Sequence, residues 1–150
     1  MSDRRNDPTA FVFINECAII EHLSRTAAER VLPEGLSLAG FTVLNHMIRL
    51  GHERRAPARI AGAVQVTKGA MTGTLKRLEA EGWISVTADP DDGRGKVVML
   101  TPEGRAIRET ALRVLALQLE PVLRAVSEDE LRQAIPVLQK VRAALDAARD

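Results

Sequence analysis

Residues 66–101 read "VTKGAMTGTLKRLEAEGWISVTADPDDGRGKVVMLT", and a helical pattern gives way to a strand pattern within this stretch. Thr67 is a favourable helix N-cap, and Gly82 is a typical helix stop. Between them, apolar residues recur at helical spacing, at Met71, Leu75 and Leu78. After Gly82 the sequence alternates and is rich in β-branched residues on both sides of a turn of Gly and Asp. The stretch therefore predicts a helix followed directly by a β-hairpin.

The residues before this stretch predict the partner of a helix-turn-helix. Pro57 is expected to open a short helix whose inward side chains are Ile60, Ala61 and Val64. That helix leads by a tight turn into the one capped by Thr67. Ser37 is expected to cap an earlier helix that ends at Gly51, and its predicted buried stripe is Phe41, Leu44 and Ile48. Between Gly51 and Pro57, "HERRA" is interpreted as a charged loop.

Long helical patterns occupy both ends of the chain. Apolar residues recur at helical spacing through the first of them, from Ala10 to about Val31, and through a second that begins at Pro102. Pro121 should kink or end this second helix. Ser127 and Glu130 then form a capping box for a last helix, which Pro136 should bend.

These elements predict a mainly α fold with a small β-hairpin wing. The winged helix-turn-helix is expected to occupy residues 37–101 as a DNA-binding lobe. Residues 10–31 and 104–148 are expected to be dimerisation helices, and the whole of residues 1–150 to be a single domain.

Composition narrows the classes of protein. With 150 residues and 45% hydrophobic content the chain fits one globular domain. Its apolar runs fall far short of the roughly 20 residues that span a bilayer, its N-terminus lacks the apolar core of a signal peptide, and Cys17 is its single cysteine. We therefore expect a cytoplasmic protein with no membrane partner. The net charge is only +1, but residues 49–105 hold 10 Lys or Arg and 7 Asp or Glu, so the middle of the chain is its basic part.

Two glycines on the helix after Thr67 need an explanation, because each costs about 0.5–1 kcal/mol relative to alanine in a helix interior. At 100° per residue, the face opposite the apolar stripe carries Gly69, Gly73, Lys76 and Ala80, with Thr72 and Arg77 on its flanks. A small, basic, hydroxyl-bearing face favours close approach to duplex DNA. The alternative is that Gly69 lies in the tolerant first turn and Gly73 admits a neighbouring helix.

Four stretches resemble the MarR (multiple-antibiotic-resistance regulator) family of bacterial transcription factors, over nearly the whole chain. They are "LSLAGFTVL", "VTKGAMTGTLKRLEAEGWI", "DPDDGRGKVVMLTPEG" and the leucine-spaced terminal helices. The third is the most specific, through the joint spacing of Asp92, Arg94, Leu100, Thr101 and Gly104. The sequence departs from the family pattern at Gly40, often a glutamine, and at Gly93, often a basic residue.

The resemblance implies an obligate homodimer whose terminal helices interlock and whose recognition helices enter the major grooves of a pseudo-palindromic operator. It also implies that Arg94 reaches into the minor groove, held by charge pairing with Asp92, and Lys96 could replace part of the charge that Gly93 lacks. The candidate DNA-binding residues are Thr67, Lys68, Gly69, Thr72, Gly73, Lys76, Arg77, Asp92, Arg94 and Lys96.

We expect a transcription regulator, a repressor, that responds to a small molecule held between the dimerisation helices and the DNA-binding lobe. The candidate pocket residues are Phe13, Cys17, Phe41, Leu44 and Met47, for which core packing is the default role.

Three alternatives stay open. Cys17 resembles a peroxide-sensing thiol of the same family, but the chain has no tyrosine to surround it, and a packed neutral cysteine is the other interpretation. A winged-helix adaptor that binds protein instead of DNA is the second alternative. The third, an enzyme, has little support, since we find no catalytic arrangement or cofactor motif. We also expect no metal site, because the histidines lack a ligand spacing on one helix face.

Overall fold

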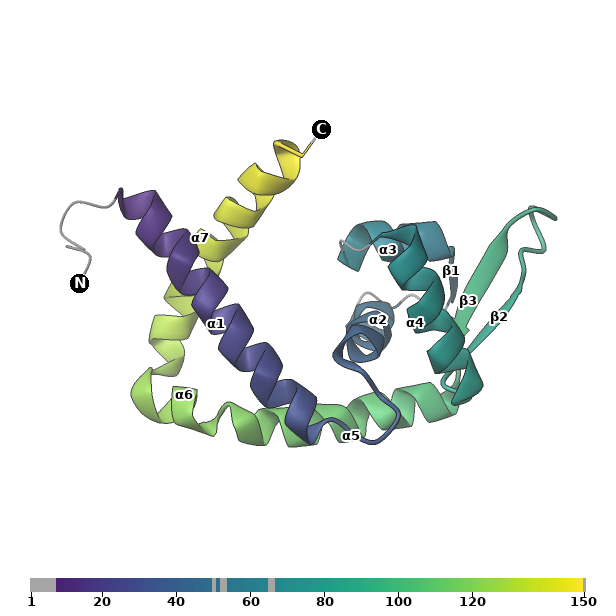
Figure 1. Cartoon of the computed structure of the whole chain (residues 1–150), viewed down its shortest axis with the longest axis horizontal. Coiled ribbons are helices and arrows are strands. Elements are labelled where there is room, and N and C mark those ends of the chain that lie inside the picture. Colours follow the sequence, from purple (N-terminus) through teal and green to yellow (C-terminus); the bar gives the residue numbers. More distant parts are fainter. Residues whose placement is uncertain (1–7, 50, 52–53, 65–66, 150) are drawn as a thin grey trace. The chain divides into compact units, whose positions relative to one another are not determined.

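The computed structural model describes residues 8–49, 51, 54–64 and 67–149 (Figure 1). Contacts divide the chain into two compact units, Met1–Leu115 and Ala116–Asp150. The first contains the helix-turn-helix and the wing, and the second contains the last helices of the chain. Among the described residues, no helix is both long and apolar enough to cross a membrane.

The core of the first unit is built from the helices α2 (Leu38–Arg49), α3 (Pro57–Val64) and α4 (Lys68–Ala80). Side chains from all three, from Trp83 and from the strands form one buried cluster. Its most completely buried large members are Leu44, Met47, Ile60, Ile84, Val43 and Val98. The predicted helix-turn-helix is thus the framework of the core.

The helix α4 has the predicted ends and the predicted buried face. Thr67 Oγ1 accepts a hydrogen bond from the backbone N–H of Ala70 at 3.2 Å, which is an N-cap contact. Gly82 follows the helix with φ +76°, a conformation that L side chains rarely adopt. The apolar stripe is buried, with exposed fractions of 2% for Met71, 6% for Leu75 and 2% for Leu78.

Of the three residues in the predicted stripe of α2, Leu44 is fully buried and the other two are not. The buried residues of α2 are Gly40, Val43, Leu44 and Met47, whereas Phe41 and Ile48 are only half-buried. A Cβ on Gly40 would lie 3.0 Å from Leu78 Cδ2, so α2 approaches α4 closely at this glycine. Gly40 lies on the same buried face of α2 as Val43, Leu44 and Met47.

Strands β2 (Ile84–Ala88) and β3 (Lys96–Leu100) form the predicted antiparallel hairpin, with Val86 opposite Val98. A third strand, β1 (Arg54–Arg55), pairs with β3 on its other side, so the sheet order is β1-β3-β2. The charged-loop prediction missed β1 because two arginines carry no apolar alternation.

The wing joins α5 (Pro102–Gln118) through a tight corner. Thr101 Oγ1 donates a hydrogen bond to the Gly82 carbonyl at 2.7 Å and accepts one from the Gly104 N–H at 3.0 Å. A Cβ on Gly104 would lie 2.0 Å from the carbonyl oxygen of Trp83. Thr101 and Gly104, from the stretch "DPDDGRGKVVMLTPEG", therefore form the corner between the wing and α5.

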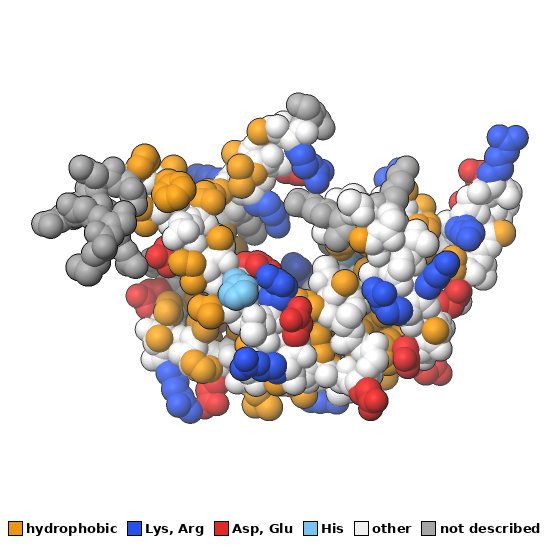
Figure 2. Space-filling model, viewed as in Figure 1, with side chains coloured by type: hydrophobic (Ala, Val, Ile, Leu, Met, Phe, Trp, Pro, Cys, Tyr) orange, Lys and Arg blue, Asp and Glu red, His pale blue; other side chains and the backbone are white. Residues whose placement is uncertain are grey.

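The helix α1 (Thr9–Val31) belongs to the first unit and is largely exposed. Ala28 is its only buried residue among those described, and Phe13 and Cys17 are half-buried. Its exposed large apolar side chains are Phe11, Val12, Ile14, Ile19, Ile20 and Leu23. In Figure 2 hydrophobic side chains gather over this helix on the face shown.

In the second unit, α6 (Glu120–Ala125) and α7 (Glu128–Ala147) follow the end of α5. Pro121 stands in the first turn of α6, so the predicted long helix ends just before it, as expected. The predicted capping box of α7 is confirmed: Ser127 Oγ accepts from the Glu130 N–H at 3.2 Å, and Glu130 Oε2 accepts from the Ser127 N–H at 2.8 Å. Hydrogen bonds to the Glu130 carboxyl, first from the backbone N–H of Ser127 and then from the Ser127 side chain, lower its pKa.

Candidate nucleic-acid interface

The face of α4 opposite its buried stripe is uncovered. A Cβ on Gly69 would meet nothing within 4 Å, and one on Gly73 would meet only Arg77 Nη1, at 3.8 Å. Within the described residues, therefore, no neighbouring helix packs against Gly73, and the packing explanation for this glycine is wrong. The two glycines leave a shallow strip of backbone along a solvent-facing helix.

Polar and basic side chains border this strip. Thr67, Thr72, Lys76 and Arg77 are all exposed. Lys68 opens α4, but its side chain lies outside the described residues. Thr74 differs, since it is 5% exposed and its hydroxyl donates to the Ala70 carbonyl at 3.1 Å. Among the described side chains, Thr72, Lys76 and Arg77 are thus exposed on the helix that carries the two glycines.

The wing tip is held by its acidic residues, although not as predicted. Asp92 Oδ1 accepts a hydrogen bond from the backbone N–H of Arg94 at 3.1 Å, and the Gly95 N–H donates to the Asp92 carbonyl at 3.0 Å. Among the described residues no carboxylate pairs with the Arg94 guanidinium, so charge pairing with Asp92 is a wrong prediction. The Asp92 carboxylate accepts from the backbone N–H two residues on, which is an Asx turn. Arg94 is exposed at the tip of this turn.

Two further wing positions were singled out in the sequence. Lys96 is exposed at the first residue of β3, opposite Ala88. A Cβ on Gly93 would meet nothing within 4 Å, so packing does not require glycine there. In Figure 2 the wing, on the right, carries Lys or Arg side chains to its end.

Sequence reasoning missed a contact between α4 and the wing. Glu79 Oε2 accepts a hydrogen bond from the backbone N–H of Val86 at 2.9 Å. Val86 lies on β2, an edge strand of the sheet, so the carboxylate accepts from a backbone N–H at that edge and joins α4 to the wing. Glu79, Arg94 and Lys96 also border a hollow of about 310 Å³ between them. A glutamate near a helix end gives no sequence signal for this role.

The five candidate effector-pocket residues lie at different depths. Leu44 and Met47 are 0% and 1% exposed and belong to the core, while Phe13, Cys17 and Phe41 are half-buried. None of these five lines the hollow of about 340 Å³ that the first unit contains among α1, α2, α3 and α4. Its lining residues are Arg25, Glu29, Leu38, Ala39, Thr42, Val43, Val64, Ala70, Met71 and Thr74. Leu44 and Met47 thus have the core-packing role that was their default interpretation.

The remaining candidates add no chemistry to this site. Cys17 is half-buried on α1. In the part of the chain that the structure describes, no three His, Cys, Asp or Glu side chains form a group that could hold a metal ion.

A helix-turn-helix followed by a hairpin wing, with an uncovered basic face on its second helix, defines a winged-helix DNA-binding protein. Residues 34–95 match the family model described as MarR family. The chain is 29% identical over 124 residues to the multiple antibiotic resistance protein MarR of Escherichia coli K12, covering 80% of this chain and 86% of MarR. It is 28% identical over 116 residues to the transcriptional repressor YetL of Bacillus subtilis, covering 77% and 70% of the two chains.

Solved structures agree with this assignment. The transcriptional regulator BldR of Sulfolobus solfataricus superposes with a TM-score of 0.80 at 26% identity, over 90% of this chain and 95% of BldR. Wild-type MarR of E. coli gives a TM-score of 0.71 at 26% identity, over 90% and 97%. A mutant of that MarR, solved in complex with operator DNA, gives 0.66 at 28% identity, over 89% and 99%. The chain is thus similar to the MarR family of transcription regulators, and these similarities support a DNA-binding transcription regulator.

Proposed function

We propose that the chain is a homodimeric repressor that binds a pseudo-palindromic operator and responds to a small-molecule effector. The observation that carries this proposal is the uncovered face of α4, where Gly69 and Gly73 expose backbone between basic and hydroxyl side chains. A protein that bound another protein there would more typically present apolar side chains. The face suits close contact with a large polyanion.

The proposed DNA contacts divide between the helix α4 and the wing. Thr72, Gly73 and Lys76 lie on the exposed face of α4 and would meet base edges and phosphates in the major groove. Arg94, at the tip of the wing, would enter the adjacent minor groove, where a guanidinium suits the negative potential. The hydrogen bond from Val86 to Glu79 joins α4 and the wing, so the two elements would contact DNA as one unit.

Exposed apolar side chains support the homodimer. Besides those of α1, the second unit exposes Leu117, Leu119, Val122, Leu123, Ile135, Val137, Leu138 and Leu145. So many exposed large apolar residues on the terminal helices indicate a surface that association buries. A pseudo-palindromic operator follows, because a two-fold symmetric dimer presents two equivalent recognition helices.

The 340 Å³ hollow in the first unit is the best candidate for the effector site. Its lining is largely apolar, with the hydroxyls of Thr42 and Thr74 and the charges of Arg25 and Glu29 as polar groups. Ala70, Met71 and Thr74 come from α4, so an occupant would touch the recognition helix directly. An effector that preferred one position of α4 would shift operator affinity by that difference in binding free energy.

Selection of duplexes from the protein's own genome tests the proposal. The purified full chain should enrich a common pseudo-palindromic sequence, and a gel shift on that operator should show one dimer per site. Enrichment without a common sequence would contradict the proposed operator.

Replacing Arg94 with alanine is expected to lower operator affinity by about 1–3 kcal/mol, because a minor-groove charge is lost. The slope of log affinity against log salt should decrease in magnitude by about 1. Fluorescence anisotropy at several salt concentrations measures both. Arg105→Ala is the matched control, since Arg105 is an exposed arginine on α5. Equal losses for the two variants would contradict a special role for the wing tip.

Deleting residues 127–150 is expected to abolish the dimer and operator binding together, because α7 carries much of the exposed apolar surface. Light scattering coupled to size exclusion measures the mass, and gel shift measures binding. A double substitution, Ile135→Glu with Leu138→Glu, tests the same interface without a deletion. It keeps the chain length and places charges where apolar residues are exposed. A truncated chain that stays a DNA-binding dimer would contradict the proposed interface.

A further inference from the structure

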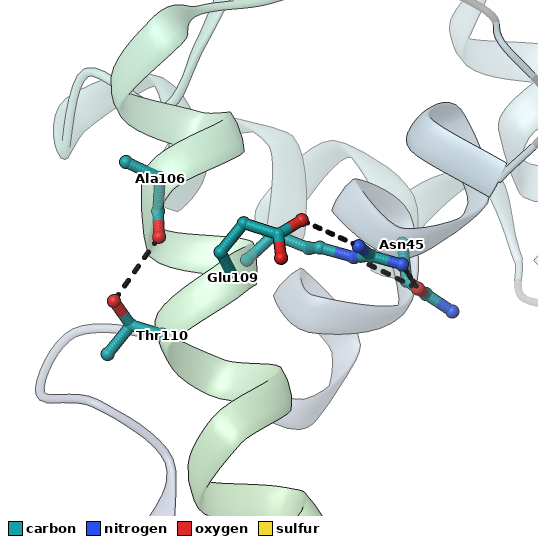
Figure 3. A network of polar contacts seen from close by, with 5 residues as sticks. Asn45, Ala106, Glu109 and Thr110 are labelled. Carbon is teal, nitrogen blue, oxygen red and sulfur yellow. Dashed lines mark hydrogen bonds and ion pairs between the residues drawn. The ribbon is translucent and has the colours of Figure 1, made fainter.

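One largely buried arginine joins the DNA-binding lobe to the helix that leaves it. Arg108, on α5, donates from Nε and Nη2 to Oδ1 of Asn45, on α2, at 3.3 and 2.8 Å. Its Nη1 donates to Oε1 of Glu109 at 2.8 Å. Only 13% of the Arg108 side chain is exposed. Figure 3 shows Asn45 on one helix and Glu109 on the other, with dashed lines from each to the guanidinium that lies between them.

The hydrogen bonds between Arg108 and Asn45 hold the guanidinium in one orientation. A guanidinium is a planar fork, so two donors that converge on one amide oxygen fix its orientation. Glu109 engages the third donor from within α5, which leaves the fork few alternative positions. Asn45 stands directly after Leu44 and two residues before Met47, both of them core residues. Arg108 therefore attaches α5 to a rigid part of the lobe.

A second attachment lies at the start of the same helix. There, Thr101 and Gly104 hold the corner between Trp83 and α5. Arg108 lies four residues beyond Gly104, or about 6 Å along the helix. One attachment alone would leave a pivot, whereas two separated attachments define the direction of α5 relative to the lobe. Beyond the second attachment, α5 continues as one helix to Gln118 and leads into the second unit.

We propose that Arg108 and Asn45 are positioning residues that set which half-site spacing the dimer accepts. The inference rests on the proposed homodimer. In a dimer held by terminal helices, α5 connects the dimer interface to each DNA-binding lobe. The direction of α5 relative to the lobe therefore sets the distance between the two recognition helices. One extra base pair between half-sites displaces a half-site by about 3.4 Å along the DNA axis. A fixed α5 rejects that displacement, and a loosened α5 tolerates it.

The test compares full-length wild type and Arg108→Lys on three duplexes. The first is the operator selected by the wild type, the second has one extra central base pair, and the third keeps one half-site and scrambles the other. Lysine keeps the charge but cannot reproduce the two-donor fork. We expect wild type to prefer the first duplex over the second by about tenfold or more. In the variant this ratio should shrink by roughly threefold to tenfold, with half-site affinity unchanged within about twofold.

Two further variants distinguish positioning from folding. Asn45→Asp keeps an oxygen acceptor for the fork, so it should retain the wild-type spacing ratio. Arg113→Lys is the matched control, since Arg113 lies on α5 and contacts the nearby Thr110 at 3.1 Å. Circular dichroism and thermal unfolding report whether each variant folds.

The inference is overturned if Arg108→Lys keeps the wild-type ratio between the first two duplexes, whatever its overall affinity. It is also overturned if half-site affinity falls as much as operator affinity, because the contact would then only support the lobe. A wild type that does not discriminate between the spacings would contradict the proposed dimer on a pseudo-palindrome, and the inference with it.

Discussion

Replacing Gly73 with leucine should reduce operator affinity by about 100-fold or more, toward the level of non-specific binding. The position lies in the middle of the exposed face of α4, and a Cβ there meets only the end of Arg77. A leucine side chain would therefore project from the protein into the groove that α4 is expected to enter. Because leucine favours helix over glycine by about 0.8 kcal/mol, the variant should unfold no more easily than wild type.

Gly73→Ala is the control for this variant, because it removes the glycine with the smallest possible side chain. It should gain up to about 1 kcal/mol of stability and lose much less affinity than the leucine variant. A gel-shift titration measures affinity, and circular dichroism confirms the fold. Normal binding by Gly73→Leu would mean that this face of α4 does not approach DNA.

Replacing Gly104 with alanine should destabilise the fold by about 3 kcal/mol or more. The added Cβ would lie 2.0 Å from the Trp83 carbonyl oxygen and 2.9 Å from its carbon, both of them backbone atoms. Backbone cannot rotate away as a flexible side chain can, so the corner between the wing and α5 would have to open. Operator binding should fall with it, since the wing starts at this corner.

Urea unfolding followed by circular dichroism measures the change, with Gly62→Ala as the matched control. Gly62 lies in α3, and a Cβ there meets nothing within 4 Å, so alanine should stabilise by about 0.4–1 kcal/mol. If Gly104→Ala were as stable as wild type, the close contact at Trp83 would not exist in solution.

The sequence was most informative where short-range chemistry decides the structure. The N-cap at Thr67, the capping box at Ser127 and the helix end before Pro121 were all predicted correctly, because each depends on neighbours within a few residues. The outward position of Gly69 and Gly73 followed from helical geometry alone.

Contacts between distant segments could not be predicted in the same way. The orientation of α2 depends on how closely Gly40 approaches Leu78, and the sequence contains no measure of that distance. Leu44 and Met47 lie in the core, their default interpretation, but the sequence could not show which side chains line the 340 Å³ hollow. The strand β1 forms only because β3 offers its second edge to Arg54 and Arg55. The Glu79 and Arg108 contacts likewise join separate elements.

The central claim is that α4 and the wing bind duplex DNA specifically. Its most direct test is the dissociation constant of the full chain for its selected operator and for a scrambled duplex of equal length, measured over a series of salt concentrations. We predict that the operator is preferred by about 1,000-fold or more and that log affinity falls linearly with log salt. Equal affinity for both duplexes, or operator affinity that does not change with salt, would contradict the claim.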